Sequence, residues 1–129
     1  MKTRSLLVAP LALLVLGFIG PVGTRAETPA SEAAFKKHCV NCHSLTPGLS
    51  TIAPDLVGVV GRKAGSLQNY KYSAALKDSD FAWTPEKLDH WLQSPHGVTP
   101  ETEMTFVGLK SEKDRAQVID FLKHYAPKK

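Results

Sequence analysis

The stretch HCVNCHSL, residues 38–45, holds both cysteines of this 129-residue chain. Cys39 and Cys42 are separated by two residues, and His43 follows the second cysteine directly. Two closely spaced cysteines and a histidine can form a disulfide, a metal site or the attachment point of a larger group. The rest of the sequence decides among these interpretations.

The first 26 residues have the features of a secretory signal peptide. A basic start, MKTR, precedes the apolar stretch LLVAPLALLVLGFIG, and the small residue Ala26 ends the segment. We therefore expect cleavage after Ala26, or else after Ala30, and a mature domain that covers residues 27–129. An uncleaved membrane anchor is the alternative, although the apolar stretch is short for a membrane-spanning helix.

Cleavage would remove most of the net positive charge. The full chain has 16 lysines and arginines against 12 acidic residues, a net charge of +4. Three of the basic residues and none of the acidic ones lie in the signal segment, so the mature domain carries a net charge of +1. This balance gives no reason to expect binding to nucleic acid or to an acidic membrane surface.

The mature segment predicts an all-α domain with long irregular connections. Thr28 and Thr84 each precede a proline, and Ser111 precedes apolar residues at helical spacing, so each is expected to begin a helix. Ser73 is expected to cap a shorter helix over AALK. Residues 44–70 are rich in Gly, Pro, Ser and Asn, which predicts loops, and no hairpin pattern is present.

Two interpretations of the cysteine motif fit the sequence poorly. A disulfide across so short a loop adds little stability, and such bridges usually follow a strand in a βαβ unit, a pattern this chain does not show. A zinc site needs four ligands. The other histidines do not supply them at ligand spacing, since His90 and His96 are six residues apart and His124 is isolated.

The third interpretation, covalent attachment of haem c, explains the spacing. The C-x-x-C-H motif is the signature of a c-type haem. Two thiols at the end of a helix, those of Cys39 and Cys42, reach the two vinyl groups, and His43 then lies under the iron as a ligand. A large cofactor would also supply the core that a small, loop-rich chain lacks. We therefore predict one haem c bound through these cysteines.

The sixth iron ligand is predicted to be Met104. Met1 leaves with the signal segment, so Met104 is the one methionine of the mature domain. It lies in the polar stretch TPETEMTFVGL, where a methionine is not an obvious core residue. The alternative ligands are four histidines, each of which is expected at the surface: His38, His90, His96 and His124.

The chain resembles class I, mitochondrial-type cytochrome c in its bacterial exported form. The resemblance runs from Phe35 to Tyr125 through FKKHCVNCH, APDLVGVVGRKAG, YKYSAAL, FAW, LDHWLQSP, TPETEMTFVGLK and DRAQVIDFL, in that order. It implies three main helices and long loops around one covalently bound haem. It also implies the axial ligands His43 and Met104, and a Pro54 carbonyl that accepts a hydrogen bond from His43.

The resemblance further implies how the haem is surrounded. Phe106 is expected to cover the exposed haem edge, and Phe35 and Phe121 to pack between the terminal helices. The buried haem propionates need hydrogen-bond donors. The donors that the resemblance implies are Arg62, Tyr72, Ser73 and Trp83.

This sequence departs from the family pattern near the haem. Ala53 replaces a glycine, and Leu76 replaces a polar residue of the pocket. Trp91 stands where the family usually has a tyrosine that hydrogen-bonds the methionine sulfur. Glu101 and Glu103 replace a glycine and a lysine before the methionine. These last changes affect the expected potential and partner.

The resemblance implies single-electron transfer, because two protein ligands leave the iron no open position for a substrate. We expect a periplasmic monomer, free of the membrane after signal cleavage. It would dock with redox-partner proteins, a dehydrogenase or reductase as donor and an oxidase or reductase as acceptor. The alternatives, a weak peroxidase-like activity and a gas sensor, both require Met104 to detach.

The lysine ring that family members use for docking is thin in this chain. Lys37 and Lys110 remain, and we expect docking mainly through apolar contact around Phe106, with a partner that is not strongly acidic. Lys36, Lys63 and Lys113 could still rebuild a positive face. The positions where the family commonly has lysine are here His38, His96, Gly97 and Glu103.

Overall fold

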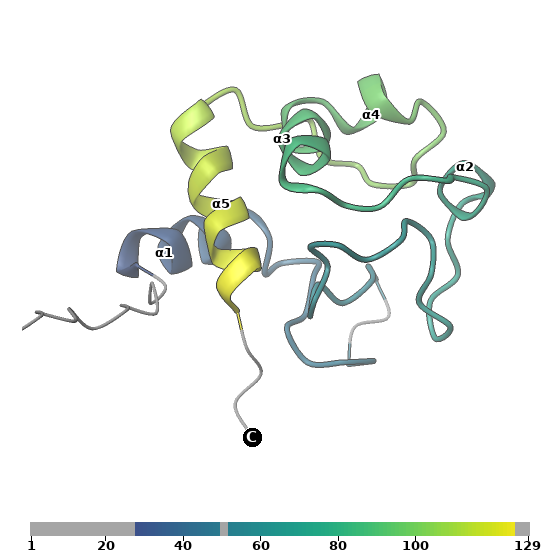
Figure 1. Ribbon diagram of the computed structural model, residues 1–129, viewed down its shortest axis with the longest axis horizontal. Helices are drawn as coiled ribbons and strands as arrows, with labels where there is room; N and C mark the ends of the chain where they lie inside the picture. The colour runs from purple at the N-terminus through teal and green to yellow at the C-terminus, as the bar shows by residue number, and fades with distance from the viewer. Residues whose placement is uncertain (1–27, 50–51, 126–129) are drawn as a thin grey trace, which may run out of the picture.

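The computed structural model describes residues 28–49 and 52–125, and it confirms the all-α prediction. Figure 1 shows the arrangement of the helices. Within the described residues the only β-pairing is an isolated antiparallel bridge between Lys63 and Ala82. The predicted signal segment lies outside the described residues. The helices are α1 (Pro29–His38), α2 (Ala74–Lys77), α3 (Pro85–Gln93), α4 (Pro95–Val98) and α5 (Glu112–His124).

Three of the predicted helix caps are confirmed. Thr28, Thr84 and Ser111 precede α1, α3 and α5, and each side-chain oxygen accepts a backbone N–H from the first turn. The prediction for Ser73 is wrong in one respect. A short helix, α2, does follow it, but its side chain makes no capping hydrogen bond.

The protein core lies along α5, which packs against both α1 and α3. Phe35 of α1 stacks on Phe121 of α5 with ring centroids 4.6 Å apart, as expected from the sequence. Phe35 and Val118 are fully buried. Figure 1 shows α5 beside α1, and α3 also packs against α5. Leu88, Trp91 and Leu92 bury the apolar face of α3.

The long segment between α1 and α2 contributes little to this core. Of its described residues, three are buried: Asp55, Val59 and Ala64. Backbone hydrogen bonds from Gly61 to Trp83 and from Ala64 to Phe81, at 2.9 and 3.0 Å, join it to the chain before α3. No helix in the described part of the chain has the length and apolar character needed to cross a membrane.

Candidate haem-attachment site

A tight turn after α1 gathers the residues of the CVNCH motif. The backbone N–H groups of Cys42 and His43 both donate to the Cys39 carbonyl, at 3.2 and 2.9 Å. Both cysteines carry thiols rather than a disulfide bridge. Burial raises the pKa of the Cys39 thiol to about 12, in contrast to the lowered pKa of a catalytic thiolate.

The imidazole of His43 is held in one orientation. Its Nδ1 lies 2.8 Å from the Pro54 carbonyl oxygen. Because a carbonyl only accepts, Nδ1 carries the hydrogen, and in the neutral ring Nε2 keeps its lone pair. Burial lowers the pKa of His43, although the hydrogen bond to Pro54 acts in the opposite direction. The ring therefore has the protonation state that an iron ligand needs.

The arrangement of the other histidines does not support a zinc site. No three side chains of His, Cys, Asp or Glu gather as possible metal ligands within the described residues. His96 instead faces the Pro100 carbonyl, with Nδ1 at 3.3 Å, and His124 lies beside Asp120. Of the three interpretations, covalent haem fits the donor set best.

Two of the expected propionate donors lie close together. The backbone N–H of Trp83 donates to the Arg62 carbonyl at 2.9 Å, which places the two stretches of backbone side by side. The guanidinium of Arg62 donates to the carbonyl oxygens of Asp55 and Val57, at 2.8 and 3.0 Å. Arg62 thus also supports the loop after Pro54, a role the sequence did not indicate.

The other two expected donors, Tyr72 and Ser73, carry hydroxyl groups. Burial raises the pKa of Tyr72, whereas the nearby charge of Arg62 acts to lower it, so the two side chains are within electrostatic reach. The Ser73 hydroxyl oxygen is buried and has no hydrogen-bond partner in the described part of the chain. A buried hydroxyl without a partner is costly. A carboxylate such as a haem propionate would satisfy it, so these residues fit the cofactor.

Met104 and Phe106 lie on one side of an extended segment. Both are half-buried and pack against the core, whereas Glu103, Thr105 and Val107 between and beside them are exposed. This alternation is that of a β-like strand with one inward face. It directs the methionine and the phenylalanine inward together, as their expected roles require.

Trp91, at the position where the family usually has a tyrosine that hydrogen-bonds the methionine sulfur, is buried. Its ring meets that of Trp83 edge to face, with centroids 5.0 Å apart. The tryptophan that replaces the family's tyrosine is therefore part of an aromatic cluster. Phe81 belongs to the same cluster, since its ring meets that of Trp83 edge to face with centroids 4.9 Å apart. At this position the side chain packs against Trp83, and it has no phenol hydroxyl that could donate a hydrogen bond to the methionine sulfur.

Sequence analysis missed the ion pair between Arg115 and Asp89. The two side chains meet at 2.7 Å between α5 and α3. A signal was present in the sequence, because Arg115 lies on the same helical stripe as Val118 and Leu122. A charged residue on an apolar stripe indicates an oppositely charged partner; here the partner is Asp89, whose side chain is 36% exposed.

Comparison with known proteins supports the haem interpretation. A model of the cytochrome c family matches residues 30–126. The chain belongs to the cytochrome c family. It is 40% identical over 104 residues to "Cytochrome c-type cyt cy" of Rhodobacter capsulatus, a match over 81% of this chain and 52% of that relative. It is 45% identical over 98 residues to cytochrome c2 of Rhodomicrobium vannielii, over 75% and 78% of the two chains.

A solved structure also resembles this cytochrome c. The structure of cytochrome cH from Methylobacterium extorquens superposes with a TM-score of 0.70 and 36% identity, covering 78% of this chain and 100% of that one. The expected class I cytochrome c fold is thereby confirmed. The chain spans only about half the length of the Rhodobacter capsulatus relative, so nothing is carried over from the remainder of that protein.

Family membership settles the cofactor and the general activity. Cytochromes c bind haem c covalently, and the two cysteines that attachment requires are Cys39 and Cys42. Members of the family are electron carriers rather than enzymes, which confirms that expectation. The assignment of individual ligands and propionate donors remains a prediction.

Proposed function

We propose that this cytochrome c is an exported single-haem electron carrier with His43 and Met104 as axial ligands. The observation that carries the proposal is the 2.8 Å contact between His43 Nδ1 and the Pro54 carbonyl, which leaves Nε2 for the iron. Haem c, when bound, supplies the Fe(II)/Fe(III) couple. Cys39 and Cys42 would hold it by thioether bonds.

The remaining residues would tune and protect this centre. The Met104 thioether favours the reduced state relative to a second histidine. Two protein ligands leave no coordination position for a substrate, which suits transfer of an electron alone. Phe106, half-buried beside Met104, would limit access of water to the haem edge. The donors to the propionates would be Arg62, Tyr72, Ser73 and Trp83.

We infer export to the periplasm from the first 26 residues. Their basic, apolar and small-residue regions are those of a signal peptide. Cleavage after Ala26 would keep Thr28 as the cap of α1, whereas cleavage after Ala30 would remove it and shorten the helix. For this reason we propose Glu27 as the mature N-terminus, and a monomer that meets its redox partners transiently.

The visible spectrum of the oxidised protein tests the ligand assignment. If Met104 is bound, a weak far-red sulfur-to-iron band should be present and should disappear on reduction. A spectrum without that band would exclude Met104 as the ligand and revive the peroxidase-like and gas-sensing alternatives. Titration with a redox mediator, which should show one reversible one-electron step, completes the test.

We also propose that docking depends little on charge. His38, at a position where lysine is common, is half-buried with Nε2 3.5 Å from the Asp114 carboxylate, and Lys36 is paired with Glu32 at 2.6 Å. Each of these two side chains therefore has a carboxylate next to it. Next to the expected haem contacts, Val107 is 86% exposed and Val40 is 46% exposed. Such side chains favour apolar contact.

The rate of electron transfer to a partner oxidase or reductase should therefore change little with salt. Between low and physiological ionic strength we expect the second-order rate constant to fall by less than about threefold, because little electrostatic steering is available to be screened. Stopped-flow mixing gives the rate, and reduction by a small uncharged reagent is the control. A fall of about tenfold or more would show a steered, lysine-driven complex instead.

A further inference from the structure

Arg115 is a buried charge on the inner face of α5. Its side chain is 7% exposed, and Nε donates to Asp89 Oδ1 on α3 at 2.7 Å. Nη1 donates to the carbonyl oxygens of Leu109 and Lys110, at 3.0 and 3.2 Å. One side chain thus joins α5, α3 and the end of the segment that follows Met104.

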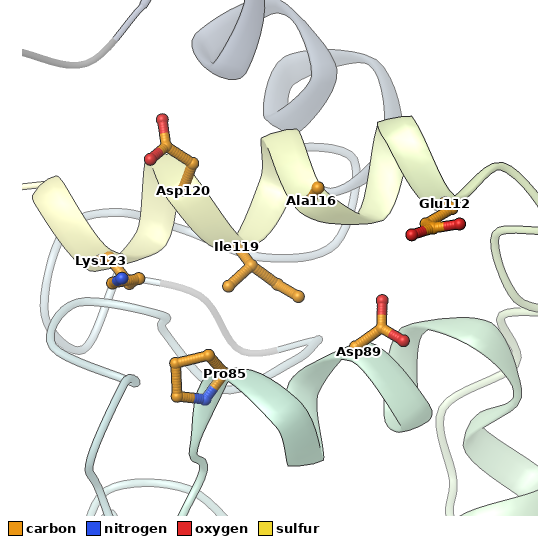
Figure 2. A pocket seen from close by; sticks show the side chains of 7 residues that line it. All are labelled: Pro85, Asp89, Glu112, Ala116, Ile119, Asp120 and Lys123. Carbon is orange, nitrogen blue, oxygen red and sulfur yellow. The ribbon is translucent and has the colours of Figure 1, made fainter.

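The ion pair lies at the boundary between α3 and α5. Figure 2 shows the shallow groove between these helices, with Asp89 projecting from α3 toward α5. Ile119 points into the groove from α5, and Glu112 and Asp120 also line it. Asp120 has a partner of its own, His124, at 3.4 Å. Asp120 is therefore a second paired carboxylate near this boundary, and its side chain points away from α3 (Figure 2).

The segment from Met104 to Leu109 is short and largely extended. From Met104 to Val107 its residues alternate between inward-facing and exposed, and it ends at the partly buried Gly108 and the buried Leu109. An extended chain spans about 3.3 Å per residue, so the first part of this segment has limited capacity to lengthen. A shift at Leu109 is therefore expected to reach Met104 through this short stretch of chain.

This segment is fixed to α3 at its Leu109 end and bonded to the buried Thr102 at its Met104 end. The Leu109 N–H donates to the Leu92 carbonyl at the end of α3, at 2.7 Å. Gly108, with φ of +97°, lies so close to α3 that an added Cβ would collide with the Gln93 carbonyl oxygen. At the other end the Met104 N–H donates to Thr102 Oγ1 at 3.3 Å. Arg115 adds its own hydrogen bonds at the Leu109 end, which we call the far anchor of the segment.

We propose that Arg115 and Asp89 are positioning residues that keep Met104 on the iron, an inference that rests on the Met104 ligation proposed above. Arg115 satisfies the carbonyls where the segment ends, and Asp89 neutralises the buried guanidinium. Removing one partner of such a pair leaves the other uncompensated. The far anchor then loosens, and Met104 leaves the iron more often.

The apparent affinity for added imidazole measures the fraction of molecules in which Met104 has left the iron. Added imidazole binds the ferric iron only when the methionine is displaced, so its apparent affinity rises with the population of the open segment. At fixed pH and salt we expect Asp89→Asn to bind imidazole about tenfold more tightly than the parent, the loss typical of a charge-assisted hydrogen bond. Arg115→Leu should exceed this, and the far-red band should weaken in both variants.

Two control variants separate positioning from general destabilisation. Asp120→Asn removes a paired carboxylate of α5 that does not face α3, and Ile119→Val loosens α5 packing. Both variants should keep the parent's imidazole affinity even where the melting temperature falls. The inference is overturned if Asp89→Asn stays within twofold of the parent, or if Ile119→Val shifts the affinity as much. If Arg115→Leu does not fold, the imidazole affinity of Asp89→Asn alone tests the inference. A parent without a far-red band refutes Met104 ligation itself, and the inference with it.

Discussion

Replacing Met104 by alanine is expected to abolish the far-red band and to lower the reduction potential by about 120 mV or more. Methionine ligation favours the reduced state, and a hundredfold change in a one-electron equilibrium corresponds to about 120 mV. Met104 faces inward with Phe106 on an extended segment, and no other methionine is present in the predicted mature domain. A neighbouring side chain therefore cannot replace it without rearranging the segment.

Thr105→Ala is the matched control for this prediction. Thr105 is exposed on the opposite side of the same segment, so its truncation should leave both the band and the potential unchanged. Potentiometric titration gives the potential, and absorbance of the oxidised protein gives the band. Retention of the far-red band in Met104→Ala would show that the sulfur is not a ligand in the parent. The same variant should also gain affinity for added ligands at the iron.

Much of the fold was predictable because its signals are local. Thr28, Thr84 and Ser111 cap the three main helices, and each cap needs only its own first turn. The attachment motif is equally local, since Cys39 and His43 are joined by one backbone hydrogen bond in a tight turn. Such features are read directly from spacing.

Contacts that depend on tertiary structure were less predictable. Ser73 has the sequence of a cap, yet its hydroxyl is buried and makes no capping bond, because the surrounding fold decides where it points. The pair of Asp89 and Arg115 joins residues 26 positions apart. Its formation requires α3 and α5 to pack side by side, which no local pattern encodes. The same holds for the Arg62 contacts with the loop after Pro54.

Removing the haem is expected to abolish cooperative folding of the chain. The buried apolar residues lie mainly on α1, α3 and α5, and between residues 40 and 82 the described part of the chain buries only Asp55, Val59 and Ala64. Leu45, Leu56 and Leu76 are only partly buried beside the core. Loops this long lose considerable conformational entropy on folding and gain little from their own packing.

The test uses a variant in which Cys39 and Cys42 are both alanine, purified without haem. A domain of this size is stabilised by only about 5–15 kcal/mol, and loss of the cofactor removes the apolar contacts that order the loops. We expect circular dichroism of the variant to change gradually on heating, whereas the haem-bound parent melts in one sharp transition. A sharp, reversible transition in the haem-free variant would show that α1, α3 and α5 form a sufficient core alone, and that the haem does not contribute to the stability of the fold.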